Sequence, residues 1–343
     1  MAPYPKVHQR KMALIGLAAG AAYGLLARLV FGVQWSTGPR EPLEFMAVSF
    51  LYLVPFVLGF ITVFVGEKGG RWEWWQWVIL PWIAGLTALA GALALAWEGI
   101  ICIVLWLPLV LVLSSLGGIA AGITGRFLPS RRRGDGLVLA CCAVLPFVVA
   151  PLESRIEAPV EMHTVENRIE IAADPATVWR QIERVPAIRE EEQSDALSHW
   201  IGFPHPVEAE LIGTGVGAVR HATFERGVLF VETITKWEPE KDLAFTIKAD
   251  TAHIPPTTLD QHVTIGGPYF DVLEGEYRIE PSGPGKVILH LSSQHRLSTR
   301  FNSYAGFWTD FIMRDTQEYI LEIIKRRCEG EALTPSGNPR SPG

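Results

Sequence analysis

Long apolar segments near the start of the chain constrain its fold more than any other feature. Four of them cover residues 12–33, 45–65, 77–97 and 100–123. About 20 mostly apolar residues are needed to cross a bilayer core, and only helices satisfy their own backbone groups there. A fifth segment, residues 136–151, is shorter and contains Pro146, so its length is marginal for a span. Residues 1–152 therefore predict an α-helical transmembrane bundle of five helices, with four as the alternative.

The rest of the chain has a different character. Residues 1–153 carry eleven Lys and Arg against seven Asp and Glu, while the remaining residues carry 19 against 29. The first part therefore has a net charge of about +4, and the second, about −10, has the composition of a soluble domain. An acidic soluble domain argues against nucleic acid as a partner.

Basic residues between the apolar segments predict the orientation, because Lys and Arg gather in cytoplasmic loops. The N-terminal tail and every second loop hold nine of them: Lys6, Arg10, Lys11, Lys68, Arg71, Arg126, Arg131, Arg132 and Arg133. We therefore expect a multi-pass integral membrane protein with a cytoplasmic N-terminus. If residues 136–151 span, which is the prediction, the C-terminal domain is extracytoplasmic. If they lie in the interface instead, that domain is cytoplasmic.

Charge inside the expected spans is sparse. Only Arg28 lies within one, close enough to its outer end for the side chain to reach the interface. Ion and substrate pathways are usually marked by intramembrane charge. The membrane half is therefore interpreted as an anchor or platform and not as a transporter.

After a linker at residues 153–163, apolar and polar residues alternate along much of the soluble half. A strand is expected at 165–171, helices at 176–185 and 186–192, and four strands at 207–211, 217–224, 228–237 and 243–247. A hairpin then begins at Phe270 and turns at residues 281–285, and a helix follows over residues 303–327. The domain would occupy 164–328, and a Pro-, Gly- and Ser-containing tail at 329–343 is expected to be disordered.

The last helix carries an apolar and aromatic stripe. Its members are Tyr304, Trp308, Phe311, Tyr319 and Ile323, flanked by Phe307, Ile312, Ile320 and Ile324. A hairpin followed by such a helix predicts an α+β domain in which a curved antiparallel sheet surrounds a long C-terminal helix.

This order of elements resembles the START-like, helix-grip superfamily, which includes polyketide cyclases and dehydrases and lipid-transport domains. The resemblance covers residues 164–328 and excludes the membrane half. It is carried by residues 174–179 after the first strand, the glycine-rich residues 213–217 entering another, Glu232 and Trp237, residues 275–279, and the closing helix. It implies a cavity between sheet and helix that binds an apolar or aromatic small molecule. It implies no particular reaction, because the superfamily is mixed in activity.

Polar residues in phase with the apolar faces are the candidate ligand-binding residues. They are Glu232, Tyr277 and His295 on strands and Asp315 on the last helix, and the aromatic residues Trp308 and Phe311 of the stripe join them as candidates. A few convergent polar groups in an apolar pocket are typical of small-molecule sites. The alternative is a satisfied polar patch, with Arg220, Arg278 or Arg314 as charge partners.

Other chemistry finds no support in the sequence. The histidines show no metal-ligand spacing, and residues 213–217 lead into a strand, whereas a phosphate-binding loop leads into a helix. No metal and no cofactor are therefore expected, and catalytic residues are not assigned.

Three functions remain open at this point. The first is a membrane-anchored binding domain for a hydrophobic small molecule or lipid. The second is a cyclase- or dehydrase-type enzyme in which Glu232 or Asp315 acts as acid or base with His295. The third is a sensor or scaffold coupled to the membrane half.

Overall fold

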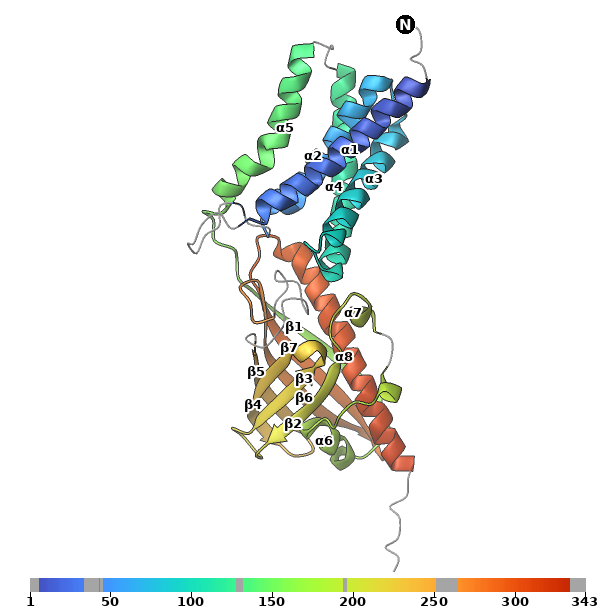
Figure 1. The fold of residues 1–343 in the computed structure, drawn as a ribbon. Helices are drawn as coiled ribbons and strands as arrows, with labels where there is room; N and C mark the ends of the chain where they lie inside the picture. The colour runs from blue at the N-terminus through green and yellow to red at the C-terminus, as the bar shows by residue number, and fades with distance from the viewer. Residues whose placement is uncertain are drawn as a thin grey trace, which may run out of the picture. The chain divides into compact units, whose positions relative to one another are not determined.

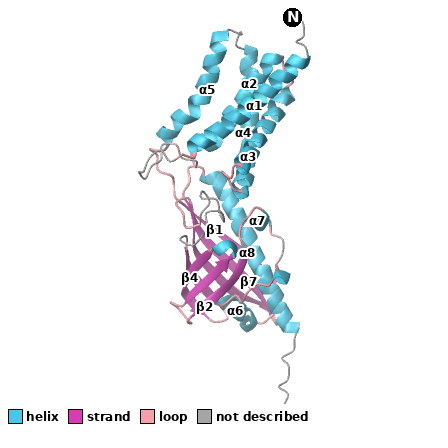
Figure 2. Ribbon diagram, viewed as in Figure 1, coloured by secondary structure: helices cyan, strands magenta, loops and turns pink. Residues whose placement is uncertain are grey.

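The structure, a computed structural model, describes residues 6–33, 43, 46–127, 132–193, 196–250 and 265–333. The chain divides into two compact units, Met1–Ala158 (unit 1) and Pro159–Gly343 (unit 2). Unit 1 is helical, and unit 2 combines a sheet with helices (Figures 1 and 2).

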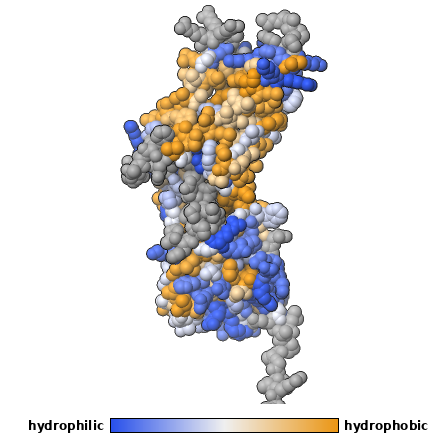
Figure 3. Space-filling model, in the orientation of Figure 1, coloured by the Kyte–Doolittle hydropathy of each residue, from blue (hydrophilic) through white to orange (hydrophobic). Residues whose placement is uncertain are grey.

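Unit 1 contains five long helices in its described part. They are α1 (Lys6–Phe31), α2 (Val54–Gly66), α3 (Trp74–Ala94), α4 (Ile100–Phe127) and α5 (Arg132–Glu153), and short helical turns at Ser49–Leu53 and Glu67–Gly69 flank α2. With these turns counted into α2, all five are long and apolar enough to cross a membrane. On the face that Figure 3 shows, hydrophobic residues dominate unit 1, whereas unit 2 is more hydrophilic.

Helix α5 is longer than the 16-residue segment that suggested a marginal span. It has 22 residues, or about 33 Å at 1.5 Å per residue, against a hydrocarbon core of about 30 Å. Its last residue, Glu153, accepts hydrogen bonds from the backbone N–H groups of Val48 (2.6 Å) and Ser49 (2.9 Å). The prediction of marginal length was wrong, because apolarity alone does not mark the charged ends of a helix.

The side chain of Arg28 does not extend to the membrane–water interface as expected. Its guanidinium is buried, donates from Nε to the Glu98 carboxylate, and donates from Nη2 to the Trp97 carbonyl oxygen at 2.8 Å. A buried charge requires a partner, and Glu98 supplies it. The pair connects α1 to the turn between α3 and α4.

Unit 2 is built on one seven-stranded sheet in which all neighbouring strands are antiparallel. The spatial order is β1-β7-β6-β5-β4-β3-β2. The strands are β1 (Glu161–Ile171), β2 (Pro206–Ile212), β3 (Val219–Phe224), β4 (Leu229–Glu238), β5 (Asp242–Ala249), β6 (Phe270–Gly283) and β7 (Lys286–Leu297). Helices α6 (Pro175–Glu183), α7 (Leu197–Trp200) and α8 (Asn302–Leu333) complete the unit. This architecture confirms the predicted α+β helix-grip fold.

Two local predictions were wrong. Residues 186–192 do not form a helix, because the Ile188 N–H donates to the Val207 carbonyl (2.7 Å) and holds the chain extended along β2. Only Glu190–Glu192 form a helical turn. Helix α8 also continues through Gly330 to Leu333, past the expected end at residue 327. The rest of the expected tail, residues 334–343, lies outside the described residues.

The two halves of α8 are buried differently. Leu321, Ile324 and Cys328 of the C-terminal half belong to the main core with Leu243 and Leu289 and are at most 1% exposed. Each such side chain contributes about 1.5–3 kcal/mol of transfer free energy.

In the N-terminal half, Trp308 and Phe311 of the stripe are half-buried, and Phe307, which flanks the stripe, is 65% exposed. Between the halves, Gln317 Nε2 donates to the Val165 carbonyl (3.1 Å) and to Ser293 Oγ (2.9 Å). The side chain of Gln317 therefore fixes α8 to β1 and β7.

An ion pair fixes the C-terminal half of α8 to the turn before α7, and it makes the stability of unit 2 depend on pH. Arg327 donates to both carboxylate oxygens of Glu192, at 2.8 and 3.0 Å, and this lowers the pKa of Glu192 from 4.5 to about 2. The stabilisation is complete above pH 4.5 and is lost as the pH falls towards 2, because the unfolded carboxyl takes up its proton first.

We expect Glu192→Gln to lower the free energy of unfolding by about 1–3 kcal/mol at pH 7. The loss should shrink towards zero near pH 2. Urea unfolding of wild type and variant across this pH range measures it, and a difference that does not change with pH would contradict the prediction.

Candidate functional site

Three of the predicted site residues lie on the inner face of the sheet. Tyr277 belongs to the main core with Ile234 of β4 and Leu291 of β7, so these positions mark the inner face. Side chains alternate along a strand, which places Glu232, two residues before Ile234, and His295, four residues after Leu291, on the same face. All three are less than 9% exposed. The predicted common face of Glu232, Tyr277 and His295 therefore exists.

Glu232 is held in a buried ion pair. Its neighbour across the β3–β4 ladder is Arg220, whose Nε donates to the Glu232 carboxylate and whose Nη1 donates to the Ile182 carbonyl at 2.6 Å. The guanidinium carbon lies 4.4 Å from the centre of the Phe245 ring. Burial raises the pKa of Glu232, while the positive charge of Arg220 lowers it. Burial also raises the pKa of Tyr277 to about 12, which keeps its hydroxyl neutral at physiological pH.

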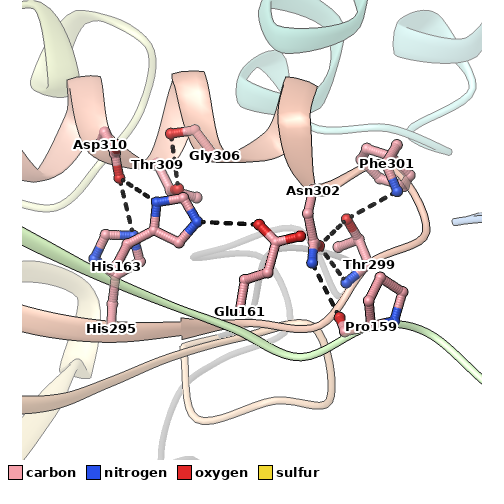
Figure 4. Close-up of polar contacts among 10 residues, drawn as sticks. All are labelled: Pro159, Glu161, His163, His295, Thr299, Phe301, Asn302, Gly306, Thr309 and Asp310. Atoms are coloured by element: carbon pink, nitrogen blue, oxygen red, sulfur yellow. Dashed lines mark hydrogen bonds and ion pairs between the residues drawn. The ribbon is translucent and has the colours of Figure 1, made fainter.

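His295 lies in a different cluster, with His163 of β1 and Asp310 of α8 (Figure 4). His163 and His295 face each other across the β1–β7 ladder, and their ring centres are 5.3 Å apart. Asp310 Oδ1 reaches both rings, lying 3.1 Å from His163 Nδ1 and 3.3 Å from His295 Nε2. The cluster thus joins the last strand, the first strand and the helix that covers them.

The imidazole of His295 is fully buried and poorly satisfied. Its side chain is 0% exposed, and within the described residues neither ring nitrogen has an aligned hydrogen-bond partner, despite the short distance to Asp310. Burial lowers the pKa of His295 to about 4, against the opposing effect of the Asp310 carboxylate. The ring is therefore neutral at physiological pH and carries one lone pair.

Neighbouring groups hold this cluster in place. Glu161 Oε2 lies 3.5 Å from Nε2 of His163, the ring nitrogen that does not face Asp310. At Gly306 of α8, a Cβ atom would lie 2.8 Å from Cε1 of His163, so only glycine lets the ring approach the helix this closely. The start of α8 is fixed by Asn302, whose Oδ1 accepts from Thr299 N (2.7 Å) and whose Nδ2 donates to the Pro159 carbonyl (3.0 Å).

Asp315 serves the first turn of α7. Its carboxylate accepts from the backbone N–H groups of Ser198 (2.7 Å) and Leu197 (3.4 Å). Beside this turn, the rings of His199 and His205 stack with centres 3.7 Å apart, and Tyr319 of α8 meets both rings edge-on. Asp315 therefore positions the α7 segment against α8.

Several buried polar atoms beneath and beside α8 have no hydrogen-bond partner in the described structure. They include Trp308 Nε1, Thr316 Oγ1 and Tyr319 Oη of α8, both ring nitrogens of His295, His199 Nε2 and His205 Nδ1. In folded proteins, the large majority of buried side-chain polar atoms bond to protein or ordered water. They lie along α8 and on the segments that pack against it, where water or another molecule is needed to pair with them.

The predicted residues are thus divided among three places. Glu232 and Tyr277 lie by Arg220, and His295 lies by Asp310, while Asp315 lies at α7. The carboxylate beside His295 is therefore Asp310, and neither Glu232 nor Asp315 forms the expected acid–base pair with it. Trp308 and Phe311 meet edge-to-face on α8, with ring centres 6.2 Å apart.

Sequence reasoning missed His163 and Asp310. His163 is two residues before Val165, in phase with the buried positions of β1, and this signal was available. Nothing in the sequence around Asp310, in contrast, distinguishes it from other acidic residues on a helix. Its place beside the two histidines becomes evident only from the pairing of β1 with β7.

Comparisons with known proteins give only distant structural similarities. No family model matches the chain, and no curated protein does. Norcoclaurine synthase from Thalictrum flavum is similar at 14% identity and a TM-score of 0.32, over 50% of this chain and 96% of that one. A START superfamily protein from Mycobacterium smegmatis is similar at 14% identity and a TM-score of 0.33, over 50% of this chain and 99% of that one.

A conserved protein of unknown function from Enterococcus faecalis is similar at 16% identity and a TM-score of 0.28, over 53% of this chain and 78% of that one. Similarities this distant carry no information about ligand or reaction. The fold itself is evident from the order of elements in unit 2, namely strand, short helices, antiparallel strands and long helix. The chain joins a domain with the helix-grip fold to five N-terminal helices that are long and apolar enough to cross a membrane.

Proposed function

We propose that unit 2 binds a hydrophobic small molecule or lipid between its sheet and α8, and that unit 1 anchors it in a membrane. The observation that carries the proposal is the set of buried polar atoms along α8 that have no partner among the described residues, including Trp308 Nε1 and Tyr319 Oη. Leaving a buried polar group unsatisfied costs about 1–3 kcal/mol, so several in one interface favour a ligand that pairs with them.

A buried apolar cluster also packs against α8. Phe230, Val272 and Ile265 form a buried cluster on the sheet side, and Met313 of α8 packs against it. An apolar lining with a few polar groups is the usual construction of a small-molecule site. The indole Nε1–H of Trp308 can only donate a hydrogen bond, so the ligand must offer an acceptor oxygen. An amphipathic molecule such as a lipid or an isoprenoid with an oxygen function meets both conditions.

Unit 1 supports the anchoring role through its five apolar helices. The basic residues of the expected cytoplasmic side also gather at one end of it. A Cβ on Gly69, in the turn after α2, would lie 2.6 Å from Met12 near the start of α1, and Arg126 at the end of α4 stacks 4.3 Å from the Trp77 ring at the start of α3. This arrangement favours a cytoplasmic N-terminus and an extracytoplasmic unit 2.

Ligand retention tests the proposal. The full chain is purified in detergent and extracted with organic solvent, and the extract is quantified by mass spectrometry per mole of protein. Trp308→Phe keeps an aromatic ring but removes the donor, so the amount of one retained species should fall about three- to tenfold.

The matched control is Phe307→Leu, because Phe307 is 65% exposed and adjacent in sequence. Lipids bound around the helices of unit 1 should be equal in wild type and both variants. The proposal fails if no species distinguishes Trp308→Phe from Phe307→Leu, or if the only extracted molecules are those equal lipids.

A further inference from the structure

The cluster of His163, His295 and Asp310 has a chemistry beyond that of a polar ligand contact. Each residue offers one ligand atom, and all three atoms lie within 4.8 Å of one another. We propose that these three side chains bind a divalent transition-metal cation between β1, β7 and α8. The cation would occupy the space bounded by the two imidazole rings and the Asp310 carboxylate (Figure 4).

The distances fit such a site. Tetrahedral zinc has bonds of about 2.0–2.1 Å to nitrogen and oxygen, which places neighbouring ligand atoms about 3.3 Å apart. Asp310 Oδ1 lies 3.1 Å from His163 Nδ1 and 3.3 Å from His295 Nε2. These two edges of the coordination polyhedron are already formed. The planes of the two imidazole rings are inclined by only 23°, so the rings must rotate for both nitrogens to point at one cation.

A bound cation also explains the environment of His295. A fully buried imidazole with neither nitrogen in an aligned hydrogen bond is costly, and coordination gives one of its nitrogens a strong partner. Surface carboxylates often cluster without a metal, but this cluster contains a histidine on β7 whose side chain is 0% exposed.

Residues next to the cluster would hold the ligand side chains in position around a cation. A metal-ligating histidine usually turns its second nitrogen to a carboxylate, and Glu161 Oε2 lies 3.5 Å from Nε2 of His163. Gly306 leaves the space that the His163 ring occupies against α8. These contacts orient Nδ1 of His163 towards Asp310.

The donor set selects the class of cation. Two imidazole nitrogens and one carboxylate oxygen suit zinc, iron, cobalt or nickel, whereas magnesium and calcium prefer all-oxygen sites. Three protein ligands leave at least one coordination position open. That position takes water, or an oxygen of the molecule bound beneath α8, so the second possibility rests on the proposed function.

Cobalt titration provides the test. The full chain, purified in detergent with any affinity tag removed, is stripped with a chelator and titrated with Co²⁺ while visible absorption is recorded. One equivalent should bind and give cobalt ligand-field bands, and Zn²⁺ should displace it, while Mg²⁺ in large excess should not. A chain that takes up no Co²⁺, or binds it only as weakly as Mg²⁺, would overturn the proposal and leave a hydrogen-bonded cluster.

Variants locate the site. Asp310→Asn should reduce Co²⁺ affinity by more than about 100-fold, and Glu161→Gln by about 10–100-fold, the usual effect of losing a supporting carboxylate. The Asp310 side chain is 36% exposed, so the fold should tolerate its change. His221→Ala is the matched control, because His221 lies on β3, outside the cluster, and should leave affinity unchanged. Equal loss in His221→Ala, or none in Asp310→Asn, would refute the assignment.

Ligand retention is measured separately, so failure of the metal site and failure of ligand binding are distinguishable.

Discussion

Replacing Glu232 with alanine should lower the free energy of unfolding of unit 2 by about 3–5 kcal/mol. Arg220 is 2% exposed and has its charge balanced by the Glu232 carboxylate. Without that carboxylate, a guanidinium remains buried between Phe245 and the Ile182 carbonyl with no counter-charge. Stability is measured as the urea concentration at which unit 2 of the full chain, in detergent, becomes susceptible to protease.

A double variant separates the cost of an unpaired charge from lost packing. Arg220→Met with Glu232→Leu removes both charges and keeps similar volume, so its loss should be well below that of Glu232→Ala, since replacing both members of a buried ion pair is often neutral. If Glu232→Ala is close to wild type in stability, the pair does not carry the structural role assigned to it. If the double variant is as unstable as Glu232→Ala, the loss of stability comes from altered packing and not from an unpaired charge.

Much of the fold could be predicted because its determinants are local in sequence. Alternation in residues 165–171 and 228–237 sets the faces of β1 and β4, and Asp174 followed by Pro175 marks the start of α6. There the Asp174 carboxylate accepts from the Thr177 N–H at 2.9 Å, as a helix cap should. Patterns of this kind do not depend on which strand lies beside which.

The site was less predictable because it depends on strand register. His163 lies opposite His295 only because β1 pairs with β7 in one register, and a shift by one residue would turn either side chain to the other face. The same long-range packing brings Asp310 to both rings, 147 residues from His163 in sequence. The sequence identified His295 as inward-facing, but its partners required the structure.

For Glu232, the sequence pattern could predict burial but could not identify the charge partner. Its phase with Phe230 and Ile234 correctly indicated burial, and Arg220 was one of three possible partners. Arg278 and Arg314 lie elsewhere, since Arg278 is near Glu166 at 3.4 Å and the side chain of Arg314 is exposed. Only the β3–β4 register distinguishes Arg220 from the others.

A reporter that is active only after export should be active when fused after Gly343. The reason is the path of α5 beside α1. Tyr23 donates to the Ala143 carbonyl at 3.0 Å, and further along both helices the rings of Phe31 and Phe147 lie 5.4 Å apart. Later residues of one helix meet later residues of the other, so α5 runs parallel to α1. If α1 leaves the cytoplasm, α5 leaves it in the same direction.

The ends of α5 agree with that path. Its final residue, Glu153, accepts from the backbone of Val48 and Ser49, which come after the first span, so both belong to the end of unit 1 remote from the basic tail. The matched control is the same reporter fused after Arg133, at the start of α5, where it should be inactive. Activity after Gly343 and none after Arg133 means that α5 crosses the bilayer. An inactive reporter at both positions, in a stable fusion, would place unit 2 in the cytoplasm and restrict its ligands to those of the inner leaflet.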